Sequence, residues 1–463
     1  MAGYYFLTLA VLLLAAFFVG RSRAVGVSGG NFAAMHSLPT YHGLLLAAMV
    51  LVPMLFVFAI GAPLVNALSN SYALSHFPAD VQSDGMMRGA ALRETINLAT
   101  GQHSGEVSDN LQAAADTYRT TAIIGGLIVY ALGVSAAGIA VLIGLGRITI
   151  GYRARNHFEQ FVKMMLLACA AVAVLTTIGI LFSVSFETIR FFFDPSLEGR
   201  PTITEFLFGT EWNPQAALRA DQGDIKTAFG FIPLLTGTAL ITLIAICVAG
   251  PLGLYSAIYL SEYASPRFRA WAKPVLEILA GIPTVVLGFF AALTVAPLVR
   301  GWGAYFGLDI ASESALAAGL VMGMMIIPFI SSLSDDVINA VPQSLRDGAY
   351  ALGATRSETI RQVVLPAALP GIVSAFMLAI SRAIGETMIV VMAAGLAANL
   401  TFNPLEAVTT ITVQIKTILV GDQEFDSAKT LAAFALGFVL FFVTLMLNVI
   451  ALTVVRRYRE QYD

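Results

Sequence analysis

An all-α integral membrane protein, built as a polytopic bundle of helices, is the fold class that the sequence predicts. Hydrophobic residues make up 57% of the 463 residues and charged residues only 12%, whereas about a quarter of an average soluble domain is charged. The mean hydropathy of the chain is +0.80. Uncharged runs of about 18 or more residues recur along the chain, and each is long enough to cross a bilayer as a helix.

The first third of the chain is expected to contribute three spans. They are the apolar runs at 3–20, 43–65 and 120–146. A cleavable signal peptide carries its positive charges before its apolar run, whereas Arg21 and Arg23 follow the first run here. We therefore predict a first span whose N-terminus lies outside. The segment 66–119 has an acidic balance that suits an external loop, and basic residues between Arg147 and Lys163 then indicate the cytoplasmic side.

Six further spans are expected in residues 164–463. They are the apolar runs at 164–186, 229–253, 275–299, 314–333, 371–397 and 430–455. Lysine and arginine gather in the segments 147–163, 261–273 and 334–366 and at the C-terminus, and such segments favour the cytoplasmic side. The predicted topology therefore has nine spans, with an external N-terminus and a cytoplasmic C-terminus.

The polar segment 342–366 is expected to form two short helices between two spans. The first would end at Gly353, since glycine commonly stops a helix, and the second would carry Glu358 in its first turn and end at Pro366. On spacing alone, this segment could also be an ordinary amphipathic pair of surface helices. The apolar residues of the second helix recur at helical spacing and could press into the groove of a partner: Ile360, Val363 and Val364.

An arginine and a glutamate lie near the middle of the apolar run 371–397. A charged group there costs at least about 2.5 to 3.5 kcal/mol on insertion scales, so it needs compensation. Arg382 and Glu386 are four residues apart and would lie on one face of a helix, where they could form a purely structural ion pair. Alternatively both line an aqueous pathway, because a guanidinium group binds a tetrahedral oxyanion through two oxygens at a time.

Three segments resemble those of a known family. Asp347-Gly348-Ala349, followed by Gly353 and Leu365-Pro366, resembles the coupling loop of ABC importer permeases, although that pattern most often begins with Glu-Ala-Ala. The run from Arg382 to Thr387 resembles the charged span of phosphate importer permeases. The run from Phe206 to Pro214 resembles their external loop.

This resemblance implies a permease subunit of an ATP-driven importer that carries inorganic phosphate across the bacterial inner membrane. Residues 164–463 would form its six-span core, and residues 1–163 would be an N-terminal membrane extension outside that core. The implied substrate pathway consists of Arg382, Glu386, Ser381, Thr387 and Gly385. The implied contacts to the ATPase are Asp347, Gly348, Ala349, Gly353, Glu358, Ile360, Leu365 and Pro366, and the implied contacts to a binding protein are Glu211 and Trp212.

The partners that the resemblance implies are a homologous second permease, two copies of an ATPase, an external phosphate-binding protein and membrane lipids. The chain lacks the Gly-x-x-x-x-Gly-Lys-Ser/Thr loop that cradles nucleotide phosphates, so we expect ATP to be bound and hydrolysed by the ATPase. We expect no cofactor, metal or enzymatic activity in this chain itself. A net charge of −3 without a basic block argues against nucleic acid as a partner.

Two rival functions stay open at this stage. A permease for another oxyanion, such as sulfate or molybdate, would use the same arginine chemistry. A secondary transporter that works without ATP could also combine broken helices with an intramembrane arginine.

Overall fold

The computed structural model describes residues 2–102, 105, 107–197, 199–214, 228–420 and 427–459. Within these ranges nine helices are long and apolar enough to cross a membrane. The predicted fold class, an all-α polytopic membrane protein, is confirmed. The chain divides into two compact units, residues 1–175 and residues 176–463. The boundary predicted at 163/164 and the division at 175/176 both fall inside one helix, α6 (Ala154–Phe193).

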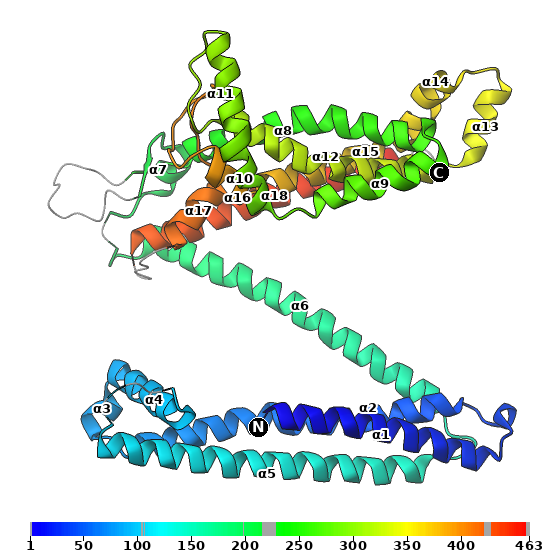
Figure 1. Cartoon of the computed structure of the whole chain (residues 1–463), viewed down its shortest axis with the longest axis vertical. Coiled ribbons are helices and arrows are strands. Elements are labelled where there is room, and N and C mark those ends of the chain that lie inside the picture. The colour runs from blue at the N-terminus through cyan, green and yellow to red at the C-terminus, as the bar shows by residue number, and fades with distance from the viewer. Residues whose placement is uncertain are drawn as a thin grey trace. The chain divides into compact units, whose positions relative to one another are not determined.

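Three long helices lie side by side in the first unit (Figure 1): α1 (Ala2–Ser28), α2 (Pro39–Leu74) and α5 (Asp109–Arg147). Glycines allow their close approach, because a Cβ at Gly43 would meet the backbone oxygen of Phe17 at 2.6 Å. The Tyr5 hydroxyl donates a hydrogen bond to the Met54 carbonyl oxygen, 2.8 Å away, inside the same packing layer. A 3-10 turn, Phe32–Ala34, precedes α2.

Much of segment 66–119, which was expected to be a loop, is helical in the structure. The α2 helix continues to Leu74, and two short helices follow, α3 (Ala79–Ser83) and α4 (Gly85–Thr100). The α5 helix already begins at Asp109, where the Ser108 hydroxyl caps it by accepting a hydrogen bond from the Leu111 amide. The predicted end of each span was the point where the apolar run gives way to polar residues. A helix forms its backbone hydrogen bonds internally, so it can continue past that point.

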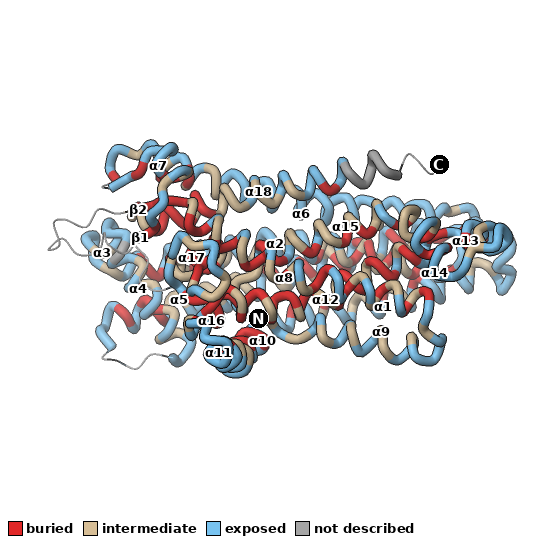
Figure 2. Tube along the Cα trace, turned by 90° about the horizontal axis from the view of Figure 1, so that it is seen from above, coloured by how far each residue is buried: buried red, intermediate tan, exposed pale blue. Residues whose placement is uncertain are grey.

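The second unit is built around a central pair of helices, α8 (Ile232–Ile258) and α12 (Ala315–Ala340) (Figure 2). Their shared core is apolar, and Ala245, Met322 and Ile326 are fully buried in it. A π-helical turn, Tyr259–Tyr263, extends α8. The other long helices of this unit are α15 (Leu365–Ile384) and α18 (Ala428–Arg459).

The single span predicted at 275–299 is wrong in its bounds. In the structure α9 (Pro266–Ala280) ends at Gly281, and Pro283 precedes a new helix. That helix consists of α10 (Thr284–Phe290), a π-helical turn (Ala291–Val295) and α11 (Ala296–Tyr305). Pro283 has no backbone N–H to donate to the preceding turn, which favours a helix end before it. The helix of membrane-spanning length in this region is therefore Thr284–Tyr305.

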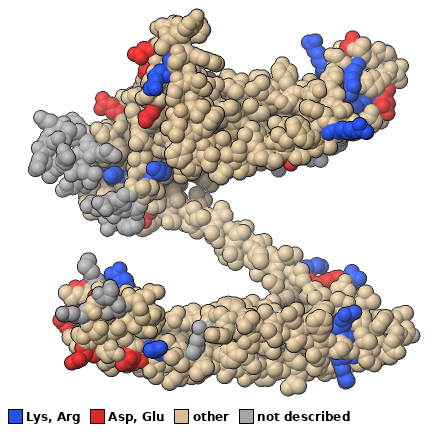
Figure 3. Space-filling model, in the orientation of Figure 1, with Lys and Arg blue, Asp and Glu red and all other residues tan. Residues whose placement is uncertain are grey.

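Short elements gather at one end of the second unit (Figure 1). They are α7 (Ile203–Phe208), α16 (Met388–Ala393), α17 (Ile411–Leu419) and a two-stranded antiparallel sheet of β1 (Trp212–Asn213) and β2 (Ala228–Phe229). On the face shown in Figure 3, charged side chains gather at the ends of the long helices of each unit, and the length between them is nearly free of charge. This distribution fits helices that cross a bilayer.

Candidate functional site

The predicted coupling segment contains two short helices that protrude beyond the ends of α8, α12 and α15 (Figure 1). They are α13 (Gln343–Ala351) and α14 (Arg356–Thr359). The first stops as predicted, because Gly353 takes a left-handed backbone conformation with φ of 86°. A capping box starts the second, in which Thr355 and Glu358 satisfy each other's backbone amides. Asp347 and Gly348 are exposed on α13, and Ala349 is half-buried.

Pro366 does not end the second helix of this segment, contrary to the prediction. A π-helical turn, Ile360–Val364, joins α14 to α15, so that the chain is helical from Arg356 to Ile384. Pro366 lies directly after this π-helical turn, within the continuous helix, and its ring does not interrupt the helix there. The coupling segment is therefore continuous with the span that carries Arg382.

The apolar face predicted to contact a partner is largely buried within the chain itself. Ile360 is 5% exposed and Val364 is fully buried, and Val364 packs with Ile338 and Val341 at the end of α12. The exposed apolar side chains of this segment lie instead on α13 and just after it: Leu345, Tyr350 and Leu352. Leu352 is 91% exposed, which makes it the most accessible of the three.

A buried ion pair that the sequence analysis missed holds α13 in place. The Arg346 guanidinium contacts Oε1 of Glu262 at 3.0 Å from Nη2 and 3.2 Å from Nε. It also donates hydrogen bonds to the carbonyl oxygens of Ile338 and Val341. Both charged residues are only 8% exposed. Neither residue belongs to a recognised motif, and nothing in the sequence indicates that two residues 84 positions apart form a pair.

A second polar cluster, also missed, joins α9 to α12. Asp335 is 1% exposed, and its carboxylate accepts hydrogen bonds from Arg269 at 2.8 and 3.0 Å and from Lys273 at 2.9 Å. Asn339 donates to the same carboxylate. Hydrogen bonds to Asp335, followed by those to Asp336, raise the pKa of Lys273.

Arg382 and Glu386 do not lie on successive turns of one helix, as the sequence had suggested. The α15 helix ends at Ile384, Gly385 forms its C-cap, and α16 begins at Met388. Glu386 therefore lies in a break, where its Oε1 accepts hydrogen bonds from the amides of Met388 at 3.0 Å and Ile389 at 3.3 Å.

The arginine is free of such contacts. Arg382 is exposed in the last turn of α15, and within the part of the chain that the structure describes no ion pair or hydrogen bond engages its guanidinium. Ser381 and Thr387 flank it half-buried, and Gly385 is exposed. The Thr412 hydroxyl of α17 donates to the Glu386 carbonyl oxygen at 2.9 Å and fixes the break.

The two residues predicted to meet a binding protein differ in accessibility. Glu211 is exposed. Trp212 is 8% exposed, packs against Phe229 of the neighbouring strand, and bonds through its indole N–H to Gln414. The Trp212 ring is therefore a packing residue in this structure, and Glu211 is the member of the pair on the surface.

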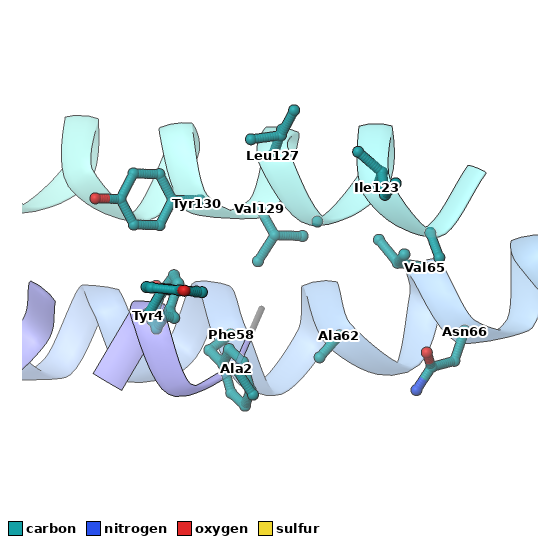
Figure 4. Close-up of a pocket in the computed structure, with 13 residues that line it drawn as sticks. Ala2, Tyr4, Phe58, Ala62, Val65, Asn66, Ile123, Leu127, Val129 and Tyr130 are labelled. Atoms are coloured by element: carbon teal, nitrogen blue, oxygen red, sulfur yellow. The ribbon is translucent and has the colours of Figure 1, made fainter. Parts of the chain in front are cut away.

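Two cavities lie apart from Arg382. One, of about 630 Å³, lies in the first unit between α1, α2 and α5, and Figure 4 shows its apolar lining, which includes Phe58, Val129 and Tyr130. None of its lining residues is charged, so it offers an anion no opposite charge. The other, of about 370 Å³, lies under α13 and is polar, and Glu262, Arg346 and Arg356 line it. The Arg356 guanidinium lies over the Tyr263 ring, 5.0 Å from its centre.

Two family descriptions match this chain. Residues 6–176 match "Phosphate ATP-binding cassette transporter", and residues 249–460 match "Binding-protein-dependent transport system inner membrane component". The first match covers the N-terminal spans, for which no sequence motif suggested a function.

Relatives of known name match more than half of this chain. The probable ABC transporter permease protein YqgH of Bacillus subtilis is 33% identical over 278 residues, which are 60% of this chain and 84% of that protein. The phosphate transport system permease protein PstC 1 of Mycobacterium tuberculosis is 33% identical over 278 residues, 54% of this chain and 81% of that protein. Among solved structures, a chain of a bacterial alginate ABC transporter is 15% identical, with a TM-score of 0.47, and the match covers 65% of this chain and 96% of that one.

Proposed function

Because the chain belongs to the family of PstC-like ABC transporter permeases, we propose that it carries inorganic phosphate across the bacterial inner membrane through a pathway lined by Arg382. The observation that carries the proposal is the exposed Arg382 guanidinium in the last turn of α15, which no side chain among the described residues pairs with. The N-terminus would lie outside, and α13 and α14 would lie on the cytoplasmic side.

Arg382 is suited to a transported oxyanion. A guanidinium group stays charged at any physiological pH and presents a planar fork of donors that matches two phosphate oxygens. In the structure the Glu386 carboxylate is engaged by two backbone amides. Among the described residues no carboxylate pairs with Arg382, so that a phosphate ion can take that place and leave again. Ser381, Gly385 and Thr387 would line the same passage.

The test of this pathway is uptake by a reconstituted complex that contains the second permease, the ATPase and a phosphate-loaded binding protein. We expect Arg382→Gln to assemble normally and to lower uptake by about ten- to a hundredfold, the equivalent of about 1.5 to 3 kcal/mol for hydrogen bonds to a charged group. Arg300→Gln is the matched control, since Arg300 is an exposed arginine of another candidate span. Undiminished uptake by an assembled Arg382→Gln complex would remove Arg382 from the mechanism.

The nature of the anion is decided in the same assembly. Phosphate-loaded binding protein should stimulate ATP turnover, and sulfate-loaded or molybdate-loaded binding protein should not. If only the sulfate-loaded protein stimulated turnover, the substrate assignment would fail although the importer assignment stood. Uptake that continues without ATP and without the ATPase would instead favour a secondary transporter.

We propose that Leu352, just after α13, contacts the ATPase. In this scheme ATP is bound by the ATPase and not by this chain. Burying one leucine side chain contributes about 1.5 to 3 kcal/mol, so Leu352→Ser should weaken binding of the ATPase by about ten- to a hundredfold. The thermal stability of the chain itself should not change, because Leu352 is 91% exposed. Leu308→Ser is the control, since Leu308 is an exposed leucine outside this segment. Equal affinity of the ATPase for both variants would exclude Leu352 from the contact.

A further inference from the structure

The C-terminal turns of α12 connect three other elements through buried polar contacts. Arg346 reaches this region from α13, Glu262 from the π-helical turn that extends α8, and Arg269 from α9. The contacts of Arg346 and Arg269 meet on residues 335–341, at the end of the most deeply buried candidate span of the described chain, and Glu262 joins them through Arg346. We call this group of contacts the α12 joint.

Arg346 is the main attachment of α13 to the rest of the chain. It is the only buried residue among the nine of α13, all of which the structure describes. Its planar guanidinium contacts the Glu262 carboxylate on one edge and the carbonyl oxygens of Ile338 and Val341 on another. A displacement of α13 is therefore transmitted to α12 and to the end of α8 through the Arg346 side chain.

Asp335 attaches α9 to α12, as Arg346 attaches α13. None of the fifteen residues of α9 is buried, so apolar packing holds this helix weakly. Its polar attachment is strong, because Arg269 and Lys273 both contact an Asp335 carboxylate that is 1% exposed. Asn339, one turn later on α12, bonds to Asp335 and also accepts from Arg269. When α12 moves, α9 is held to it.

We propose that Arg346 and Asp335 are positioning residues of the transport cycle, which transmit a displacement of α13 through the α12 joint to α8, α12 and α9. The inference rests on the proposed function, since it needs an ATPase that moves α13. Neither residue touches the substrate in this scheme. Their role is to keep the four elements moving together, which the apolar contacts of α13 and α9 are too few to ensure.

A second route for the same displacement exists along the chain itself. The α14 helix continues through Ile360–Val364 into α15, and Val364 packs on Ile338. If this continuous helix carried the motion alone, the α12 joint would contribute only to stability. The two routes predict different outcomes for variants of the α12 joint. If the joint transmits the motion, such variants move less phosphate per ATP hydrolysed, and if the continuous helix does so alone, this ratio is unchanged.

The experiment measures this ratio in the reconstituted full complex, together with binding of the ATPase. Arg346→Lys keeps the charge but loses the fork that contacts both Glu262 and the two carbonyl oxygens. Asp335→Asn removes the charge and keeps the size. We expect both variants to bind the ATPase and hydrolyse ATP, and to move about tenfold less phosphate per ATP than the unchanged complex.

A double variant, Arg346→Met with Glu262→Leu, removes the buried pair without leaving a lone buried charge. It should fold and should show the same low ratio. Arg267→Met is the matched control, because Arg267 is an exposed arginine of α9 that contributes no contact to the α12 joint. Its ratio should equal that of the unchanged complex.

Three results would overturn the inference. Unchanged ratios in Arg346→Lys and Asp335→Asn would assign the motion to the continuous helix. Failure of every variant to assemble would make the α12 joint a folding element only. If ATP turnover and phosphate uptake fell by the same factor in these variants, the ratio would be unchanged, and this would also contradict transmission through the α12 joint. If the unchanged complex itself showed no phosphate-dependent ATP turnover, the proposed function would fail instead.

Discussion

The indole N–H of Trp212 donates a hydrogen bond to Oε1 of Gln414, 3.0 Å away, although the two residues are 202 positions apart. Gln414 is 6% exposed, and its amide group also donates to the carbonyl oxygen of Leu396 and to the hydroxyl of Thr409. One buried glutamine of α17 therefore ties the strand β1 to the loop that follows α16.

Replacement of this glutamine should be costly. Gln414→Leu leaves the indole N–H of Trp212 buried without an acceptor, and we expect a loss of about 1 to 3 kcal/mol in the free energy of unfolding. Thermal unfolding of the purified chain in detergent measures the loss. Gln343→Leu is the control, because Gln343 is exposed and should change stability by no more than about 0.5 kcal/mol. Equal stability of the two variants would contradict a structural role for the Trp212–Gln414 bond.

The role of Glu386 can be separated into hydrogen bonding and charge. Its carboxylate caps α16 in the structure, so Glu386→Ala should destabilise the fold by about 0.5 to 2 kcal/mol. Glu386→Gln keeps an oxygen acceptor at the same reach and should retain most of that stability. Thermal unfolding in detergent distinguishes the two variants. If glutamine cost as much as alanine, and if Arg382→Gln relieved that cost, an ion pair between Arg382 and Glu386 would be the better description.

Gly237 marks the place where α8 approaches the loop before α17 most closely. A Cβ at this position would overlap the Thr409 carbonyl oxygen. Gly237→Ala should therefore destabilise the fold by about 1 to 3 kcal/mol, because a backbone atom must move. In α18, a Cβ at Gly437 would meet nothing within 4 Å, so Gly437→Ala should be neutral or stabilising by up to about 1 kcal/mol. Thermal unfolding of both variants tests this contrast, and equal losses would contradict it.

Lys273 should give the fold a dependence on alkaline pH. Hydrogen bonds to Asp335 and Asp336 raise the pKa of Lys273 above its ordinary value of 10.5. A raised pKa in the folded state means that the stabilisation is fully present below pH 10.5 and is lost as the pH rises through the folded-state pKa. From about pH 9 upward, the free energy of unfolding should therefore fall more steeply with pH for the unchanged chain than for Lys273→Met.

The control for this titration is Lys163→Met. Lys163 is exposed on α6 and forms no ion pair with the residues that the structure describes, so its removal should leave the alkaline slope unchanged. A Lys273→Met variant with the slope of the unchanged chain would show that the contacts to Asp335 do not depend on the ammonium charge.

The sequence by itself determined the class of fold, the number of candidate spans among the described residues, and the helix end at Gly353. These features depend on local properties, because the length of an uncharged run decides whether a helix can cross a bilayer, and glycine adopts the left-handed backbone without strain. The sequence also placed Arg382 within a span, where the structure has it in the last turn of α15.

Only the tertiary structure decided which side chains of those segments are buried and where the helices break. Ile360 and Val364 are buried in the chain's own core, where Val364 shares a cluster with Ile338 of α12. Glu386 lies beyond the end of α15, where the amides of α16 donate to its carboxylate. The Arg346–Glu262 pair joins residues 84 positions apart. Periodicity along one helix contains no information about such distant partners, and burial and pairing are properties of those partners.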